Sequence, residues 1–309
     1  MDEPDPESSG FHGAIHAGGN HPPARGRYHL YASLACPLAH RTLIVRMLKG
    51  LHQCVGVSVV DPLPGADGWI FSDAPGCEPD FVNHARCLRE LYEKARPGYS
   101  GPATVPMLWD SERHTIVNDH PADLLRLLNE AFDEHAVYPE VDLYPPDLRA
   151  CIDSLNARLG REVDETIDAA GRAATVQSAR GQALRCLYGT LDWLDDRLAR
   201  QRYLAGDALT EPDVRLFTTL VRFDAVYYER CGCTGRRIED YRHLSGYLRD
   251  LYQTPGFGDT VNMAHIRQHF GASQATLSPG LLPAGPRLDF LRTHDRERLS
   301  APPPRWQAR

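Results

Sequence analysis

One cysteine stands where a folded chain can make a thiol reactive. Cys36 follows a short β-prone run and precedes Pro37, after which apolar residues recur at helical spacing as far as Gly50. This pattern predicts that the sulfur lies at a helix N-terminus, beside unpaired backbone N–H groups and at the positive end of the helix dipole. Such a position favours the thiolate, the nucleophilic form of cysteine. We therefore predict that Cys36 is a catalytic nucleophile; a buried, inert thiol is the alternative.

The motif around Cys36 lacks a second cysteine that could resolve a disulfide formed on this thiol. Ala39 occupies the place where a Cys-x-x-Cys motif has its second cysteine. A disulfide formed on Cys36 must then be resolved by an outside thiol, so we expect a low-molecular-weight thiol as cosubstrate. Further along, Val105 and Pro106 precede another strand and, paired with the Cys-Pro-x-Ala sequence upstream, resemble the cis-proline turn of thioredoxin-like folds, which offers backbone groups to a bound thiol peptide.

The elements expected to position these residues alternate between strand and helix. A strand over 28–32, the helix after Cys36 and a strand over 54–60 predict a β-α-β unit with a parallel crossover. A hairpin with strands over 104–109 and 115–117 follows, and Pro121 begins another helix. The order β-α-β-α-β-β-α is that of a thioredoxin-like domain.

After about residue 145 strand signals nearly vanish and helical periods take over. Thr210 and Asp213 form a capping box that predicts a helix start, with Pro212 tolerated in the first turn. The predicted fold is thus α/β plus all-α, a thioredoxin-like domain followed by an all-helical domain. The predicted helices cover 148–159, 179–198, 212–228 and 244–253.

The chain is predicted to divide into four parts. These are a flexible N-terminal arm over 1–26, mobile or wrapped on the surface, the thioredoxin-like domain over 27–135, the all-helical domain over 145–286 and a charged tail over 287–309.

Composition excludes several classes of protein. The chain has 309 residues with 42% hydrophobic and 24% charged, which predicts two globular domains. A net charge of -7 argues against a nucleic-acid partner. There is no apolar run of membrane-spanning length, and the acidic start is unlike a signal peptide, so we expect no membrane partner and a cytoplasmic protein. Only Lys49 and Lys94 among 34 basic residues are lysine, which indicates a high-GC bacterial genome.

Scattered histidines and cysteines raise the question of a metal. Eight cysteines are too sparse for a disulfide scaffold, so free thiols are expected. His12, His16 and His21 fall in the N-terminal arm, where a defined ligand geometry is not expected. The Cys-Gly-Cys sequence at 231–233, with His243 further on, has the ligand types of a zinc site but not a complete pattern. The prediction from sequence is that the protein holds no metal.

Several longer stretches resemble the Xi class of glutathione transferases, the glutathionyl-hydroquinone reductases, over about residues 27–286. The matching stretches are residues 27–46, 68–71, 104–110, 116–118, 209–227, 236–241 and 260–269. The resemblance implies a homodimer in which a cysteine, here Cys36, takes glutathione from a glutathionylated hydroquinone as a mixed disulfide that a second glutathione resolves. It also implies that Trp69, Val105 and Pro106 contribute to the glutathione site.

The chain departs from the family where the family holds glutathione. Leu38 replaces the Trp of the family sequence Cys-Pro-Trp-Ala-His, and Pro102 replaces an Arg. His120 and Pro121 stand where the family has the Glu and Ser that hold the γ-glutamyl group. Removing one charge-assisted contact costs about 1.5–3 kcal/mol, so glutathione use should be weakened or altered. His120 could instead set the charge state of the thiol or hold a substrate carboxylate; a histidine facing water is the alternative.

The pocket for the acceptor substrate is also predicted to differ from the family pattern. Tyr227 retains one family tyrosine, whereas Asp168 falls where another tyrosine stands and Phe270 belongs to a replaced Tyr-Tyr pair. Asp168 could act as a general base or an orienting anion, or simply be a solvated helix residue. The predicted substrate-binding residues are therefore Leu38, Asp168, Tyr227 and Phe270.

Three functions follow from these observations. The first is a cysteine-dependent, glutathione transferase-like enzyme that carries out thiol transfer or reductive deglutathionylation on a quinone-like or other electrophilic aromatic, in specialised metabolism, with glutathione or another low-molecular-weight thiol as cosubstrate. The second is a thiol-independent isomerase, cyclase or lyase in which Cys36 adds to the substrate itself. The third is a non-catalytic ligand-binding homologue.

Overall fold

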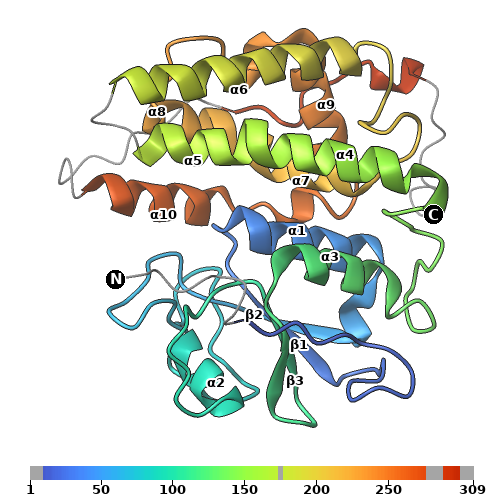
Figure 1. Cartoon of the computed structure of the whole chain (residues 1–309), viewed down its shortest axis with the longest axis vertical. Helices are drawn as coiled ribbons and strands as arrows, with labels where there is room; N and C mark the ends of the chain where they lie inside the picture. The colour runs from blue at the N-terminus through green and yellow to red at the C-terminus, as the bar shows by residue number, and fades with distance from the viewer. Residues whose placement is uncertain (1–9, 173–176, 276–287, 300–309) are drawn as a thin grey trace. The chain divides into compact units, whose positions relative to one another are not determined.

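Two compact units make up the chain. The structure is a computed structural model that describes residues 10–172, 177–275 and 288–299 (Figure 1). The first unit spans 1–141 together with 260–272, and the second spans 142–259 together with 273–309. Residues 260–272 thus return to the first unit, whereas the sequence placed them in the all-helical domain over 145–286. The predicted end of that domain at 286 lies outside the described residues.

A four-stranded sheet forms the centre of the first unit. Its elements are β1 (Tyr28–Ala32), α1 (Pro37–Leu48), a 3₁₀ turn (Leu51–Gln53), β2 (Val55–Val59), α2 (Leu88–Ala95), β3 (Met107–Asp110), β4 (Thr115–Asn118), α3 (Pro121–Glu130) and, from the later part of the chain, α10 (Met263–Ala275). The strand order is β2-β1-β3-β4. β1 and β2 run parallel, with Tyr28 opposite Val55, and the β3–β4 hairpin is antiparallel with a register shift at Leu108 and Trp109. The predicted thioredoxin-like domain is confirmed.

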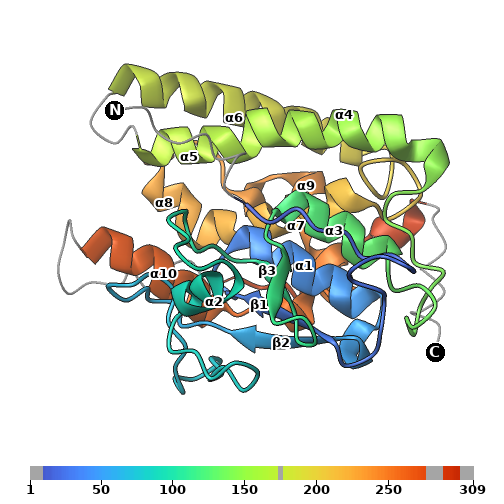
Figure 2. The same ribbon diagram turned by 60° about the horizontal axis from the view of Figure 1, so that its bottom comes forward.

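Helices α1 and α3 pack on one another on the same side of the sheet (Figures 1 and 2). The apolar side chains of α1 that recur at helical spacing, Leu43, Ile44 and Leu48, are buried. The helix ends at Lys49, and Gly50 continues the chain in the left-handed region with φ 64°, a conformation that glycine adopts without strain. Helix α2 packs on β4 instead.

The described part of the N-terminal arm lies along β4. Gly13 donates its N–H to the Val117 carbonyl at 2.7 Å, and Asp119 donates its N–H to the Phe11 carbonyl at 3.0 Å. An edge strand has unpaired backbone groups, and here the arm pairs with them. Of the two conformations that the sequence allowed for this segment, the described residues 10–26 adopt the wrapped one.

A buried ion pair fixes the end of the arm. Arg27 donates Nε and Nη2 to the Asp110 carboxylate at 3.0 and 2.6 Å, and His21 Nδ1 lies 2.7 Å from the same carboxylate. Burial acts to raise the pKa of Asp110, but the hydrogen bonds from Arg27 and His21 outweigh it and hold the pKa below its ordinary value. Asp110 ends β3, so this pair joins the arm to the central strand.

Helices are the main elements of the second unit in its described residues. They are α4 (Arg149–Leu159), a π-helical turn (Gly160–Asp164), α5 (Glu165–Arg172), α6 (Gln177–Leu198), α7 (Glu211–Arg222), a second π-helical turn (Phe223–Tyr227), α8 (Tyr228–Arg230) and α9 (Arg242–Gln253). α4 continues into α5 and α6 lies beside α5 (Figures 1 and 2). The capping box of Thr210 and Asp213 begins α7 as predicted. The single helix predicted over 212–228 is instead interrupted by the second π-helical turn.

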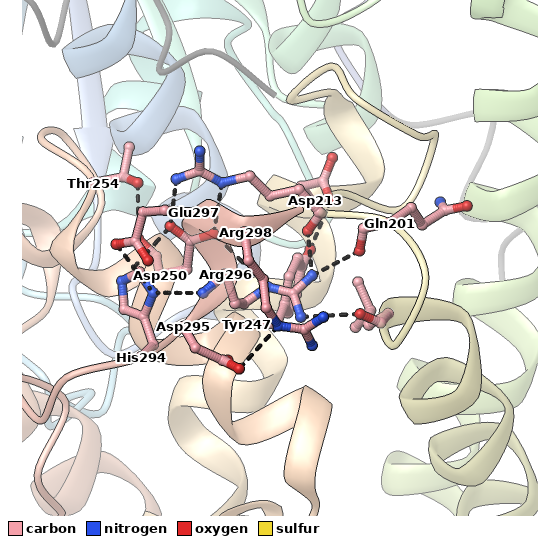
Figure 3. A network of polar contacts seen from close by, with 12 residues as sticks. Gln201, Asp213, Tyr247, Asp250, Thr254, His294, Asp295, Arg296, Glu297 and Arg298 are labelled. Atoms are coloured by element: carbon pink, nitrogen blue, oxygen red, sulfur yellow. Dashed lines mark hydrogen bonds and ion pairs between the residues drawn. The ribbon is translucent and has the colours of Figure 1, made fainter. Parts of the chain in front are cut away.

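The C-terminal segment at 288–299 differs from the predicted charged tail. Arg296 is only 2% exposed and donates from its guanidinium to the carbonyls of Leu198, Gln201 and Arg202 at 2.7–3.0 Å (Figure 3). Its Nε lies 3.8 Å from Asp250, which also pairs with Arg202. The charge pattern suggested a solvated segment because it does not reveal the backbone acceptors that this guanidinium meets in the folded unit.

Within the three described ranges, no helix combines the length and the apolar character that crossing a bilayer requires.

Candidate active site around Cys36

The Cys36 thiol sits at the start of α1. Cys36 is the N-cap residue, with φ -73° and ψ 122°, and Pro37 is the first residue of the helix. The backbone N–H of Cys36 donates to Ser33 at 3.2 Å and its carbonyl accepts from His40 at 3.0 Å. The side chain is partly exposed and makes no capping hydrogen bond. A partly exposed thiol at a helix N-terminus can attack an electrophilic sulfur or carbon.

The turn before β3 lies against this sulfur. The Val105–Pro106 peptide is cis, as the dipeptide predicted, and both residues are buried. The Val105 carbonyl oxygen accepts a weak hydrogen bond from the Cys36 thiol, with Sγ and O 3.8 Å apart. The structure therefore brings together three of the predicted residues, Cys36, Val105 and Pro106, from two loops of the same sheet.

An aromatic pair lies in the same unit. Trp69 is half-buried and stacks on His269, with ring centroids 5.3 Å apart and an interplanar angle of 18°. His269 Nδ1 is 2.8 Å from the Pro62 carbonyl, which orients the ring, and Phe270 follows, 8% exposed. Sequence reasoning named Trp69 and Phe270 but missed His269. The only sequence signal for His269 was its position at the end of the matching stretch 260–269.

The residue that replaces the family Trp in the Cys-Pro-Leu-Ala sequence lies on the surface. Leu38, which replaces the family Trp, is one of the large apolar side chains that the structure exposes, at 36%. Pro102, which replaces the family Arg, is exposed as well, and its carbonyl accepts a hydrogen bond from Tyr99 at 3.1 Å. Neither side chain can donate a hydrogen bond to a carboxylate.

A cluster of titratable groups surrounds His120 at the start of α3. His120 is the N-cap residue, half-exposed, and its backbone N–H donates to Asn118 Oδ1 at 2.8 Å. Its Nδ1 lies 3.2 Å from Asp123 Oδ1, and the other carboxylate oxygen, Oδ2, lies 3.2 Å from His12 Nδ1 in the N-terminal arm. Partial burial acts to raise the pKa of Asp123, but the hydrogen bond to His12 and the charge of His120 lower it overall. The sequence identified His120 and named His12 only as an arm residue without a defined ligand geometry, and it gave no signal for Asp123.

A cavity of about 570 Å³ lies between the arm and α3. Its wall includes arm residues 12–17 and Pro23, together with Asn118 and residues of α3 and of the turn after it. Asp123 and His12 are part of this wall, so the cluster around His120 has access to the cavity.

The two remaining predicted residues belong to the second unit. Asp168 is exposed on α5. Tyr227 is 6% exposed and ends the π-helical turn after α7. The first unit holds the other seven predicted residues, so the candidate site residues are divided between the units. The π-helical turn that carries Tyr227 is a feature frequently found at functional sites.

A pair of buried thiols lies in the helical unit. Cys231 and Cys233 are buried, and the Cys231 thiol donates to the Ile167 carbonyl at 3.5 Å. Hydrogen bonds from Cys231 and Tyr188 lower the pKa of Cys233 to about 7, whereas the neighbouring Cys233 and burial raise the pKa of Cys231. These buried thiols are distinct from the partly exposed thiol of Cys36.

Comparison with known proteins agrees with this architecture. Residues 140–250 match the family model described as glutathione S-transferase, C-terminal domain. The chain is 46% identical to the glutathionyl-hydroquinone reductase YqjG of Escherichia coli over 275 residues, covering 88% of this chain and 83% of that protein. It is 41% identical to the glutathionyl-hydroquinone reductase PcpF of Sphingobium chlorophenolicum, covering 91% and 88%.

Comparison with solved structures agrees with the comparison of sequences. The Xi-class glutathione transferase of Natrialba magadii superposes with a TM-score of 0.92 at 42% identity, covering 97% of this chain and 95% of that one. The glutathione-bound structure of Escherichia coli YqjG gives a TM-score of 0.88 at 44% identity, covering 93% and 96%. A thioredoxin-like unit joined to a helical unit defines a glutathione transferase fold. Within that class, the chain belongs to the Xi-class glutathione transferases, the family of the glutathionyl-hydroquinone reductases.

Proposed function

We propose that this protein is a cysteine-dependent thiol transferase that reductively deglutathionylates a quinone-like aromatic. The observation that carries the proposal is the partly exposed Cys36 sulfur at the N-terminus of α1, 3.8 Å from the Val105 carbonyl. The names of the relatives, glutathionyl-hydroquinone reductases, support the substrate class. We further propose that the enzyme works in the cytoplasm as a homodimer.

The proposed reaction has two steps. In the first, the Cys36 thiolate attacks the sulfur of a glutathionylated hydroquinone, the new S–S bond forms, and the bond between that sulfur and the ring carbon breaks. The ring carbon takes the electron pair and a proton, which yields the hydroquinone. In the second step a thiolate attacks the mixed disulfide, releases Cys36 as a thiolate and leaves as a disulfide. The two electrons that reduce the ring come from the glutathionyl sulfur of the substrate and the sulfur of the resolving thiol, which end as that disulfide.

The helix and the turn before β3 have separate tasks in this reaction. The N-terminus of α1 stabilises the negative charge on Cys36 before attack and after release. The backbone at Val105 aligns the thiol compound with the Cys36 sulfur. Trp69, stacked on His269, would pack against the same compound, and Leu38 and Phe270 of the same unit would contact the aromatic group.

The identity of the resolving thiol is the second part of the proposal. Pro102 and His120 supply neither the guanidinium nor the carboxylate that hold glutathione in the family, so glutathione should bind weakly, or another low-molecular-weight thiol should take its place. Half-exposed His120 is the group best placed to meet the carboxylate of that thiol.

Steady-state turnover of Cys36→Ser tests the proposal. With a glutathionylated hydroquinone and glutathione as substrates, hydroquinone formation should fall by at least about a thousandfold, because serine is not an adequate nucleophile at neutral pH. Cys186→Ser removes an exposed thiol of the helical unit and should leave the rate unchanged.

Two outcomes would change the assignment. An undiminished rate in Cys36→Ser would overturn the role of this sulfur. Turnover that depends on Cys36 but not on any added thiol would favour an isomerase, cyclase or lyase, in which the cysteine adds to the substrate itself.

A further inference from the structure

We propose that His12, His120 and Asp123 form a binding site for a divalent transition-metal ion, with Zn²⁺ and Co²⁺ as the ions it fits. The site does not include Cys36, but it shares His120 with the thiol-binding role proposed above, so a bound ion would compete with the thiol carboxylate for this side chain. Its ligands come from the N-terminal arm and from the first turn of α3, so a bound ion would join the arm to the helix.

The spacing of the three ligand atoms matches a small tetrahedral ion. Each oxygen of the Asp123 carboxylate faces a different imidazole, with Nδ1 of His12 and Nδ1 of His120 both 3.2 Å away. The three ligand atoms all lie within 4.8 Å of one another. Zinc bonds to nitrogen and oxygen at about 2.0–2.2 Å place tetrahedral ligand atoms about 3.3–3.5 Å apart. With one carboxylate oxygen as the ligand, one N···O edge already has nearly the required length, and the other two edges, which are no longer than 4.8 Å, can need to shorten.

The local backbone holds this arrangement. His120 and Asp123 are three residues apart at the start of α3, so their side chains lie on the same face of the helix. His12 pairs with Asn118 in an isolated antiparallel bridge, and the flanking bonds from Gly13 to Val117 and from Asp119 to Phe11 fix the arm on both sides of it. The ligands are therefore preorganised by backbone contacts that do not involve their own side chains.

The ligand types select the ion. Two imidazoles and one carboxylate suit Zn²⁺, Co²⁺, Ni²⁺ or Cu²⁺, whereas Ca²⁺ and Mg²⁺ prefer a full set of oxygen ligands. Three protein ligands leave at least one coordination position for water. An ordinary His–Asp ion pair would need only one imidazole for the carboxylate, but here two imidazoles share it.

An ion can also reach the site. The three side chains are 47–49% exposed, and His12 and Asp123 form part of the wall of the 570 Å³ cavity. That wall also contains the carboxylates of Glu130, Asp133 and Glu134 and the guanidinium of Arg126, and Asp133 pairs with Lys49. With Asp123 included, the carboxylates still outnumber these two cationic groups, which favours the approach of cations.

Titration of the full-length, tag-free protein with Co²⁺ tests the site. We expect one equivalent to bind, with visible d–d bands of a low-coordinate ion and without the near-ultraviolet charge-transfer band that thiolate ligands give. His12→Ala, His120→Ala and Asp123→Ala should each weaken binding at least about tenfold. His16→Ala, in the same arm and the same cavity wall, is the matched control and should bind like the wild type.

The same experiment can overturn the proposal. A thiolate charge-transfer band would place the ion on cysteines, and equal affinity in the His12→Ala, Asp123→Ala and wild-type proteins would place it elsewhere. Failure of the wild type to bind Co²⁺ or Zn²⁺ would refute the site directly. All three ligands are exposed, so the variants should fold, and circular dichroism verifies this before titration.

Discussion

Two edges of the first unit hold their functional groups in opposite ways. The sulfur edge, formed by Cys36, Val105 and Pro106, depends on a helix start and a turn between buried elements. The histidine edge, formed by His12, His120 and Asp123, consists of side chains that are about half exposed. The sulfur edge retains the family pattern, whereas His120 departs from it. A site that depends on backbone geometry is hard to change without destabilising the fold. A site made of exposed side chains can change with little loss of stability.

The largest expected contrast is in stability. Asp110 ends the strand that begins after Pro106, and its carboxylate is fully buried against Arg27. Asp110→Asn removes the buried counter-ion of that guanidinium, leaves it only the exposed carboxylate of Glu112, and should lower the free energy of unfolding at pH 7 by about 3–5 kcal/mol. His120→Ala removes an exposed side chain and should change it by less than about 0.5 kcal/mol. Urea unfolding measures the free energy of unfolding of both variants, and an equal loss in the two would contradict this prediction.

The same substitution predicts a change in pH dependence. Because the folded state lowers the pKa of Asp110, its pairing stabilises the protein above the ordinary carboxyl pKa of about 3.9, and this contribution is lost as the pH falls through the lower, folded-state value. Asp110→Asn lacks this carboxylate. The stability difference between wild type and variant should therefore shrink as the pH falls below about 4, as followed by thermal unfolding. A difference that stays constant with pH would contradict the assignment.

The second contrast concerns thiol recognition. His120→Glu combined with Pro121→Ser restores the two family residues at the histidine edge. One charge-assisted contact contributes about 1.5–3 kcal/mol, so the dissociation constant for glutathione should fall by about 10- to 100-fold. His52→Glu adds the same charge at another exposed histidine of the unit and should have no such effect. Calorimetric titration measures both, and unchanged affinity in the double variant would mean that this edge does not contact the thiol compound.

The smallest contrast tests the aromatic pair beside these edges. Trp69→Leu removes the stack on His269, an interaction of about 0.5–1.5 kcal/mol, and should raise the KM for the thiol compound by about 2- to 10-fold with little change in kcat. Trp193→Leu alters a tryptophan in the helical unit that contacts Arg158, and it serves as the control. A KM equal to that of the control would show that Trp69 only packs within its own unit.

Local sequence signals predicted most of the fold. Pro37 and the apolar spacing after it give α1, and Thr210 with Asp213 gives the start of α7, because the physical cause of each signal lies within a few residues. The π-helical turn at 223–227 was missed because one extra residue per turn leaves the apolar pattern nearly unchanged. The segment at 288–299 was misjudged because the acceptors of Arg296 lie in residues 198–202.

The site was predicted only where its parts are local. The position of Cys36 at a helix start was predicted from Pro37 and the apolar spacing after it, and the cis Val105–Pro106 turn from that dipeptide paired with the Cys-Pro-x-Ala sequence upstream. The stack of Trp69 on His269 joins residues 200 positions apart, and the contact of His12 with Asp123 joins residues 111 positions apart. Pairs of this kind depend on how the arm and α10 return to the sheet, which periodicity and spacing along the chain do not encode.

A single-turnover experiment tests the central role of Cys36 most directly. The wild-type protein is mixed with a glutathionylated hydroquinone in the absence of free thiol, quenched in acid, digested and analysed by mass spectrometry. The account predicts one hydroquinone released per chain and glutathione on the peptide that contains Cys36, reversed by added reductant. Hydroquinone released without that adduct, or an adduct confined to other cysteines, would contradict it.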